Sequence, residues 1–120
     1  MITSKWFKES EFQKASPPCS LQDMTQSHMD LIDKIRDIYG SPMIVTSAYR
    51  SEAWEKSKGR TGIGDHPQRT GMDIKAADGA SKYGIVNAAI KAGCTRIGID
   101  KGFVHIGSSK TLPQNTIWLY

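Results

Sequence analysis

The chain has 120 residues, of which 38% are hydrophobic and 23% charged, and its formal net charge is +4. This length fits one compact domain over residues 1–120 and leaves little room for a second. No stretch is long and apolar enough to cross a bilayer, and the first residues lack the apolar segment of a secretion signal. The sequence therefore argues against a membrane protein and predicts a monomer that is cytoplasmic as synthesised.

The basic residues are scattered along the chain and never form a run of about five or six. A weakly basic surface favours an anionic partner, such as a bacterial cell wall or a nucleic acid. A nucleic-acid module would use the basic residues in the middle of the chain, namely Arg50, Lys56, Lys58, Arg60 and Arg69. That interpretation leaves the histidine and aspartate pattern described below unexplained, so we expect no nucleic-acid partner.

The first half of the chain contains two predicted helices and one predicted strand. Residues 9–14 predict a short helix, and residues 25–39 predict the clearest one, because apolar side chains recur there at three- and four-residue spacing. Gly40 is well placed to end this helix, and His28 within it is expected to be exposed. Residues 43–49 are rich in β-branched side chains and predict a buried strand.

Short strands dominate the second half of the chain. A helical turn near residues 53–56 leads into a polar loop over residues 57–65, and Asp100-Lys101-Gly102 suits a tight turn between two strands. The other elements, in chain order, are a strand at 72–75, a helix over 81–92 capped by Ser81, strands at 96–99 and 103–106, and an edge strand at 116–120. Together they predict an α+β fold, a small and mostly antiparallel sheet with helices packed on one face.

Three side chains stand out in this frame. His66 and Asp73 lie at the end of the polar loop and within a predicted strand, and His105 lies in a strand between apolar neighbours. Neutral imidazole is a good zinc ligand, and two imidazoles with one carboxylate leave the fourth position of a catalytic zinc for water. A metal held in this way lowers the pKa of the water to about 7. The residue types alone leave other interpretations open, because His105 also fits a satisfied core histidine and Asp73 a carboxylate at a turn or strand end.

Four segments in a fixed order carry a family resemblance: Ser47-Ala48-Tyr49-Arg50-Ser51, Asp65-His66-Pro67, Gly71-Met72-Asp73-Ile74 and Phe103-Val104-His105-Ile106. They resemble the motifs of the zinc D-alanyl-D-alanine carboxypeptidase family, which shares a fold group with lysostaphin-type peptidases and the hedgehog signalling domain. The resemblance extends over nearly the whole chain. Its opening segment and first long helix look like those of the family's short, often phage-encoded members.

The resemblance implies Zn²⁺ as cofactor and three zinc ligands, His66, Asp73 and His105. It also implies that Arg50 binds a substrate carboxylate or stabilises the oxyanion, a role that suits a planar and permanently charged guanidinium. Two further residues are candidates for substrate binding. Trp54 lies beside the expected cleft, and Asp65 precedes the first ligand, where it binds the substrate amine or instead orients His66.

The chain departs from the family pattern at three places. The family usually has glycine three residues after the first ligand and alanine two before the aspartate, where this chain has Arg69 and Gly71. The aspartate that usually follows the last motif is Gly107, and loss of that carboxylate weakens support for a ligand. Many relatives carry a glutamate or histidine shortly before the last ligand, whereas the only carboxylate just ahead of His105 is Asp100. Asp100 is therefore the predicted general acid/base, and an ordinary turn residue is the alternative interpretation.

These observations predict a zinc metallopeptidase that hydrolyses a peptide bond in the peptidoglycan stem peptide, as a D-Ala-D-Ala carboxypeptidase or an endopeptidase. Metal-activated water would attack the carbonyl with help from Asp100, and Glu55 and Asp65 are weaker candidates for the base. Small size and the missing signal favour an endolysin-like, phage-encoded protein that reaches the wall after release. The alternative is a zinc-containing domain that has lost catalysis, as the hedgehog signalling domain is generally regarded, and that binds a wall peptide or a protein partner.

Overall fold

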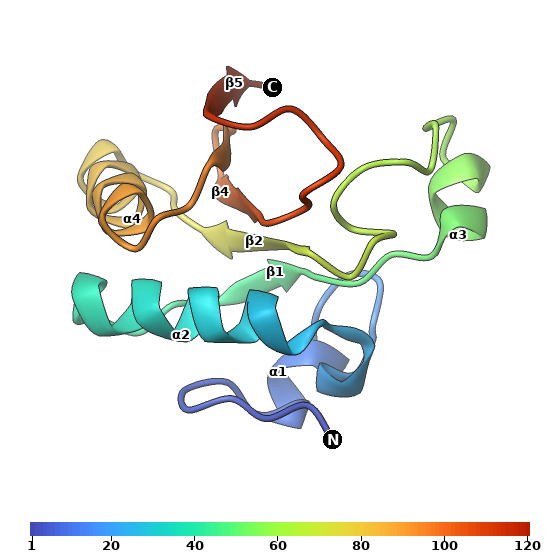
Figure 1. The fold of residues 1–120 in the computed structure, drawn as a ribbon, viewed down its shortest axis with the longest axis horizontal. Helices are drawn as coiled ribbons and strands as arrows, with labels where there is room; N and C mark the ends of the chain where they lie inside the picture. The colour runs from blue at the N-terminus through green and yellow to red at the C-terminus, as the bar shows by residue number, and fades with distance from the viewer.

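The computed structural model describes residues 1–120 and contains four α-helices and a five-stranded mixed sheet (Figure 1). The helices are α1 (Glu9–Gln13), α2 (Gln26–Tyr39), α3 (Glu52–Ser57) and α4 (Gly79–Lys91), and a 3₁₀-helix, η1, covers Leu21–Asp23. The strands are β1 (Val45–Ser47), β2 (Gly71–Lys75), β3 (Arg96–Ile99), β4 (Phe103–Gly107) and β5 (Thr116–Leu119). This architecture confirms the predicted α+β fold.

The sheet has the strand order β1-β2-β4-β3-β5. All neighbouring strands are antiparallel except β3 and β5, which pair in parallel. The last strand lies at an edge, as the sequence predicts. The first strand is shorter than the predicted 43–49, because its pairing with β2 shifts register between Val45 and Ser47. The prediction of a mostly antiparallel sheet is confirmed.

Alternation along the central strands separates an apolar face from a polar face. Asp73 in β2 pairs with His105 in β4, and Gly98 in β3 also pairs with His105, so all three positions share one face of the sheet. The side chains that alternate with them point to the other face and are 0–1% exposed: Met72, Ile74, Ile97, Val104 and Ile106. The sheet therefore has the hydrophobic core on one side and the candidate site on the other.

The two long helices build the core together. Helices α2 and α4 pack against each other, and α4 also contacts β3 and β4. Figure 1 shows α3 and the loop that follows it on the opposite side of the strands from α4. Helix α2 begins after Thr25, whose hydroxyl accepts a hydrogen bond from the backbone of His28, and ends at Gly40 with a φ of +78°. No helix has the length and apolar composition needed to span a membrane.

Two local predictions were wrong. His28 is fully buried rather than exposed, because its ring packs inside the molecule with Nδ1 2.6 Å from the hydroxyl of Ser108. Helix α4 begins two residues before the predicted cap at Ser81. The reason is that the Asp78 carboxylate accepts a hydrogen bond of 2.7 Å from the backbone N–H of Ser81, so that Asp78 is the N-cap.

Candidate metal centre

The three residues expected to bind metal converge in the structure. His66 ends the loop between α3 and β2, and the antiparallel pairing of β2 with β4 sets Asp73 beside His105. Nδ1 of His105 lies 2.8 Å from Oδ1 of Asp73, and Nε2 of His66 lies 3.3 Å from the same oxygen. One ligand atom from each residue lies within 4.8 Å of the other two. The three side chains are 2–5% exposed, so they form a buried cluster.

The second nitrogen of each imidazole is engaged away from this cluster. Nδ1 of His66 faces the carbonyl of Ala48, which can only accept, so Nδ1 carries the proton and donates it. The Nε2 of the same ring then presents a lone pair, and it is buried without a hydrogen-bond partner. In His105, Nε2 lies 3.0 Å from Oδ2 of Asp65, which leaves Nδ1 facing the cluster. An unpartnered buried nitrogen is unfavourable unless something binds it.

Charge pairing controls the ionisation of the cluster. Burial raises the pKa of Asp73, but the hydrogen bond from His105 and its charge outweigh this effect and hold the pKa well below its usual range. Burial also lowers the pKa of His105, whereas hydrogen bonds to Asp65 and Asp73 raise it, and the net result is a raised pKa. The carboxylates of Asp65 and Asp73 are therefore anionic at neutral pH, and they favour a positive charge between them.

Arg50 lies at the edge of the cluster. Its Nη1 is 3.8 Å from Oδ2 of Asp73, and its side chain is 17% exposed. The guanidinium is held by Glu55, whose Oε1 accepts from Nε at 2.8 Å, and by the hydroxyl of Ser47 at 3.2 Å. Arg60 contacts the other oxygen of Glu55 at 3.2 Å. Arg50, the predicted substrate-binding arginine, is thus fixed beside the proposed ligands. Glu55, which holds it, was predicted only as a weaker candidate for the general base.

A cavity of about 230 Å³ opens onto the cluster. Its lining includes the imidazoles of His66 and His105 and, from β5 and the residue after it, Trp118 and Tyr120. The indole of Trp118 lies 5.5 Å from the ring of His105. A Cβ at Gly98 would lie 2.7 Å from Nε1 of Trp118, so only glycine at that position lets the indole cross β3. Trp118 was not among the predicted site residues, because nothing in the sequence reveals which strand β5 joins.

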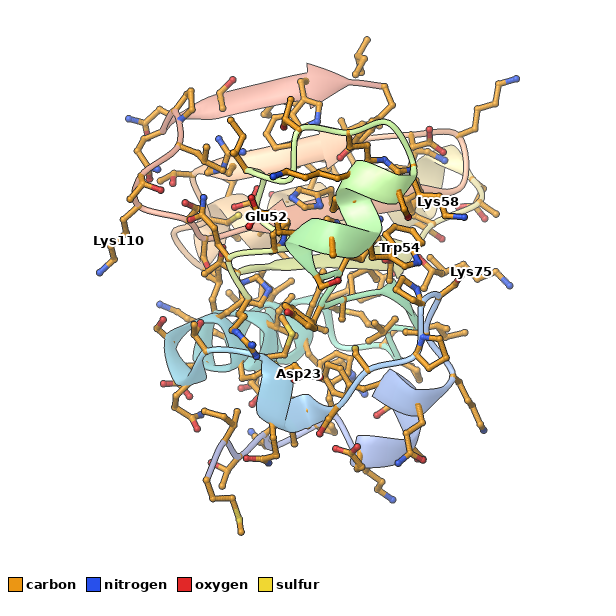
Figure 2. The ribbon with its side chains drawn as sticks, turned by 90° about the vertical axis from the view of Figure 1, so that its right-hand side faces the viewer. Asp23, Glu52, Trp54, Lys58, Lys75 and Lys110 are labelled. Carbon is orange, nitrogen blue, oxygen red and sulfur yellow. The ribbon has the colours of Figure 1, made fainter.

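The other predicted site residues lie in different places. The carboxylate of Asp65 lines the cavity but is 3% exposed and bonded to protein donors. Trp54 lies on α3, which crosses in front of the sheet in Figure 2. Its ring has the guanidinium of Arg50 at 5.7 Å and that of Arg60 at 5.4 Å, and both arginines line the cavity. Asp100 is in the β3–β4 turn, where its carboxylate accepts from Gly102 N at 3.1 Å, and it does not line the cavity.

Comparison with known proteins identifies the family of the chain. A family model described as Peptidase M15 matches residues 4–107. The chain belongs to the peptidase M15 family. No curated protein and no solved structure matches it. The match confirms the resemblance to the zinc D-Ala-D-Ala carboxypeptidases and contains all three proposed ligands, whereas β5, with Trp118, lies outside it.

The residues of this M15 chain fit the zinc on which the family depends. Two neutral imidazole nitrogens and one carboxylate oxygen are a usual ligand set for catalytic zinc, and they leave one position for water. The orphaned Nε2 of His66 is the observation that favours a bound ion, because a metal would satisfy it. His66, Asp73 and His105 would hold the ion, with Asp65 behind His105.

One departure from the M15 pattern has a structural explanation. Arg69 stands where the family usually has glycine, and it adopts a φ of +67°, which residues other than glycine rarely adopt. Its guanidinium donates to the backbone carbonyl of Asp23 at 3.0 Å and stacks 4.4 Å from the ring of Tyr49. These contacts offset backbone strain and tie the loop of His66 to the 3₁₀-helix η1.

Proposed function

We propose that the protein is a zinc-dependent peptidase that hydrolyses a peptide bond of the peptidoglycan stem. The observation that carries this proposal is the convergence of His66, Asp73 and His105 beside a cavity that is lined by both histidines and by Arg50. Membership of the M15 family supports the same reaction class. The products of digestion distinguish cleavage of the terminal D-Ala-D-Ala bond from cleavage of an internal bond.

Zinc, when bound, supplies a Lewis acid and lowers the pKa of a bound water to about 7. The chain's own residues supply orientation and charge. Arg50 is already held by Glu55 and Ser47, so little further side-chain entropy is lost when its remaining N–H groups bind a substrate. We propose that they donate to the developing oxyanion or to a terminal carboxylate of the stem. Arg60, which is half-exposed at the same wall, adds positive charge for an anionic stem.

The proton acceptor is a choice between two carboxylates. Asp100 comes just before the last ligand in sequence, but its carboxylate is bonded to its own turn. Glu55 is 4% exposed and lines the cavity, and its Oε2 has no hydrogen-bond partner although Arg60 lies 3.2 Å away. A base must reach the attacking water within about 3 Å or through one further water. We propose Glu55, because it is the carboxylate that lines the cavity without contacting a proposed ligand.

Aromatic side chains form the other wall of the site. Trp118 and Tyr120 line the cavity, and burial raises the pKa of the Tyr120 hydroxyl, which therefore stays protonated at neutral pH. We propose that the indole and phenol pack against the aliphatic part of the stem peptide, with the phenol as a hydrogen-bond donor. Trp54, the predicted substrate contact, would act by ordering Arg50 and Arg60 from outside the cavity.

The experiment is digestion of purified peptidoglycan with the zinc-loaded protein, followed by mass spectrometry of the released products. Release of D-alanine identifies a carboxypeptidase, and shortened or uncrosslinked stems identify an endopeptidase. We expect activity to disappear with a chelator and to return with zinc. His105→Ala is the matched inactive control. A wild-type protein that binds zinc and releases no product contradicts the proposal.

A second function is favoured by a specific observation. Gly102 stands where many relatives carry a glutamate, and Asp100 is engaged in the turn, so neither of these positions just before His105 in sequence supplies a carboxylate to the cavity. A zinc-containing domain that binds a stem peptide without cutting it fits this feature. The same digestion separates the two functions, since such a domain would sediment with peptidoglycan yet release nothing.

A further inference from the structure

Asp65 precedes His66 in sequence, but its carboxylate faces the other proposed histidine ligand. Oδ2 lies 3.0 Å from Nε2 of His105. Arg96 clamps the same carboxylate, with Nη2 3.0 Å from Oδ2 and Nε 3.3 Å from Oδ1, and the backbone of Ser109 donates to Oδ1 at 3.1 Å. Asp65 and Arg96 are 3% and 8% exposed. The carboxylate is therefore buried and held by donors on three other residues.

Two glycines make room for this carboxylate. A Cβ at Gly107 would lie 2.4 Å from Oδ2 of Asp65 and 2.6 Å from its Cγ, and a Cβ at Gly71 would lie 2.8 Å from the Cβ of Asp65. Such distances are below any normal contact, so a side chain at position 107 and the present position of Asp65 exclude each other. An aspartate at position 107 would direct its own carboxylate into the volume that Asp65 fills, since its Cβ would point there.

Each ring nitrogen of His105 faces a carboxylate, Nδ1 that of Asp73 at 2.8 Å and Nε2 that of Asp65 at 3.0 Å. A carboxylate only accepts, so Asp65 keeps a proton on Nε2, and Nδ1 would be the nitrogen that exchanges its proton for a metal ion shared with Asp73. A carboxylate behind a metal-bound imidazole also raises its basicity and holds the ring plane. Arg96 adds to this effect because it prevents the carboxylate from rotating away.

We propose that Asp65, clamped by Arg96, is the positioning residue of His105. Its carboxylate, which comes from the residue just before the first ligand, takes the place of a carboxylate that would otherwise come from position 107. The inference rests on the proposed function only in requiring that a metal bind His66, Asp73 and His105. It assigns Asp65 a role other than contact with the substrate.

The test is the zinc affinity of four purified proteins, measured by competition with a chromophoric chelator at neutral pH: wild type, Asp65→Ala, Gly107→Asp and the double variant. Removal of a carboxylate behind a ligand typically costs about 10–100-fold in metal affinity, and we expect this loss in Asp65→Ala. Gly107→Asp alone is expected to lose stability because its side chain collides with Asp65. The double variant relieves the collision, restores a carboxylate, and is expected to recover most of the lost affinity.

The absorption spectrum of the cobalt-substituted proteins gives a second readout, independent of activity. We expect the d–d bands of Asp65→Ala to shift from the wild-type positions and those of the double variant to return toward them. Asp65→Asn keeps the shape of the side chain and tests the charge if the smaller variant fails to fold. Asp37→Asn removes an exposed carboxylate that pairs with Lys5, and it serves as the surface control with unchanged zinc affinity.

Three results overturn the inference. Wild-type affinity in both Asp65→Ala and Asp65→Asn shows that the carboxylate does not support His105. A double variant that binds zinc no better than Asp65→Ala shows that position 107 cannot supply the group. A wild-type chain that binds no zinc ends both this inference and the proposed function, whereas hydrolysis by wild type together with undiminished zinc affinity in the Asp65 variants ends this inference alone.

Discussion

The two faces of the central sheet are almost equally buried, yet they are built from opposite kinds of side chain. On one face Ile74 and Ile106 are 0% exposed and belong to the apolar core. On the other face Asp73 and His105 are 4% and 2% exposed and belong to a network of charges. Exclusion of water stabilises the first face, whereas on the second it makes every unpaired charge costly.

The polar face is therefore not explained by stability. Replacing a buried ion pair with apolar side chains is often neutral or stabilising, so burial of Asp65, Asp73 and His105 together needs another reason. A cation held between them supplies one, because it neutralises the carboxylates and partners the free nitrogens. The predictions below change residues on these faces or near the site, and they measure metal binding, hydrolysis or stability.

The largest expected effect is on the polar face. Asp73→Ala removes the carboxylate shared by both imidazoles, so we expect loss of bound zinc and of about a thousandfold or more in peptidoglycan hydrolysis. The reason is that the metal contributes several kcal/mol to the transition state, and each 1.36 kcal/mol is tenfold in rate. Metal analysis and product release measure the two losses. A content of one zinc per chain in this variant would show that Asp73 is not a zinc ligand.

The choice of proton acceptor comes next in size. Glu55→Gln keeps a hydrogen-bond acceptor for Arg50 but removes the base, and we expect about a hundredfold loss in kcat with zinc content unchanged. Asp100→Asn is the comparison variant and is measured in the same assay. A larger loss of kcat in Asp100→Asn than in Glu55→Gln would identify Asp100 as the general base.

The pH dependence of stability distinguishes the faces in a third way. Burial lowers the pKa of His28 to about 3, so between about pH 6.5 and 3 the unfolded chain binds a proton there that the folded chain does not. His28 should then lower the stability of the metal-free protein as pH falls, by up to about 1.4 kcal/mol per pH unit, whereas the raised pKa of His105 acts in the opposite direction near pH 6. Urea unfolding between about pH 6 and 5 measures this slope, above the range in which Asp65 and Asp73 titrate.

His28→Gln is the matched variant for that measurement, because glutamine can still bond Ser108 but does not titrate. We expect the stability of wild type relative to this variant to fall as pH falls over the same interval, because His105 titrates in both proteins and His28 only in wild type. An equal slope in both proteins would show that His28 is accessible to protons in the folded chain.

The smallest effect is expected on the apolar face. Ile106→Val removes one buried methylene and should lower the free energy of unfolding by about 1 kcal/mol, measured by urea unfolding. The zinc affinity of the folded protein should stay within about twofold of wild type. A tenfold loss of zinc affinity from this change would mean that the two faces are not separable.

Sequence patterns were sufficient for the elements whose signals are local. Apolar spacing predicted the helix that ends at Gly40, and the turn at residues 100–102 was placed correctly between two strands. The order of the family motifs predicted His66, Asp73 and His105 as the ligand set. The structure brings these three together, because antiparallel pairing of β2 and β4 places two of them opposite each other.

What the sequence did not reveal depends on contacts between distant segments. Asp65 reaches His105 across forty positions, and only the loop geometry and two glycines make that contact possible. Trp118 enters the cavity because β5 adds in parallel to β3, a pairing with no local signal. His28 is buried by the segment around Ser108, which the helical pattern cannot indicate.

The most direct measurement is anomalous diffraction at the zinc edge from crystals grown with zinc. We expect a single strong peak within bonding distance of Nε2 of His66, Nδ1 of His105 and a carboxylate oxygen of Asp73, with the Asp65 carboxylate still bonded to Nε2 of His105. A chain saturated with zinc that shows no peak among these atoms, or one that binds the ion elsewhere, would contradict it.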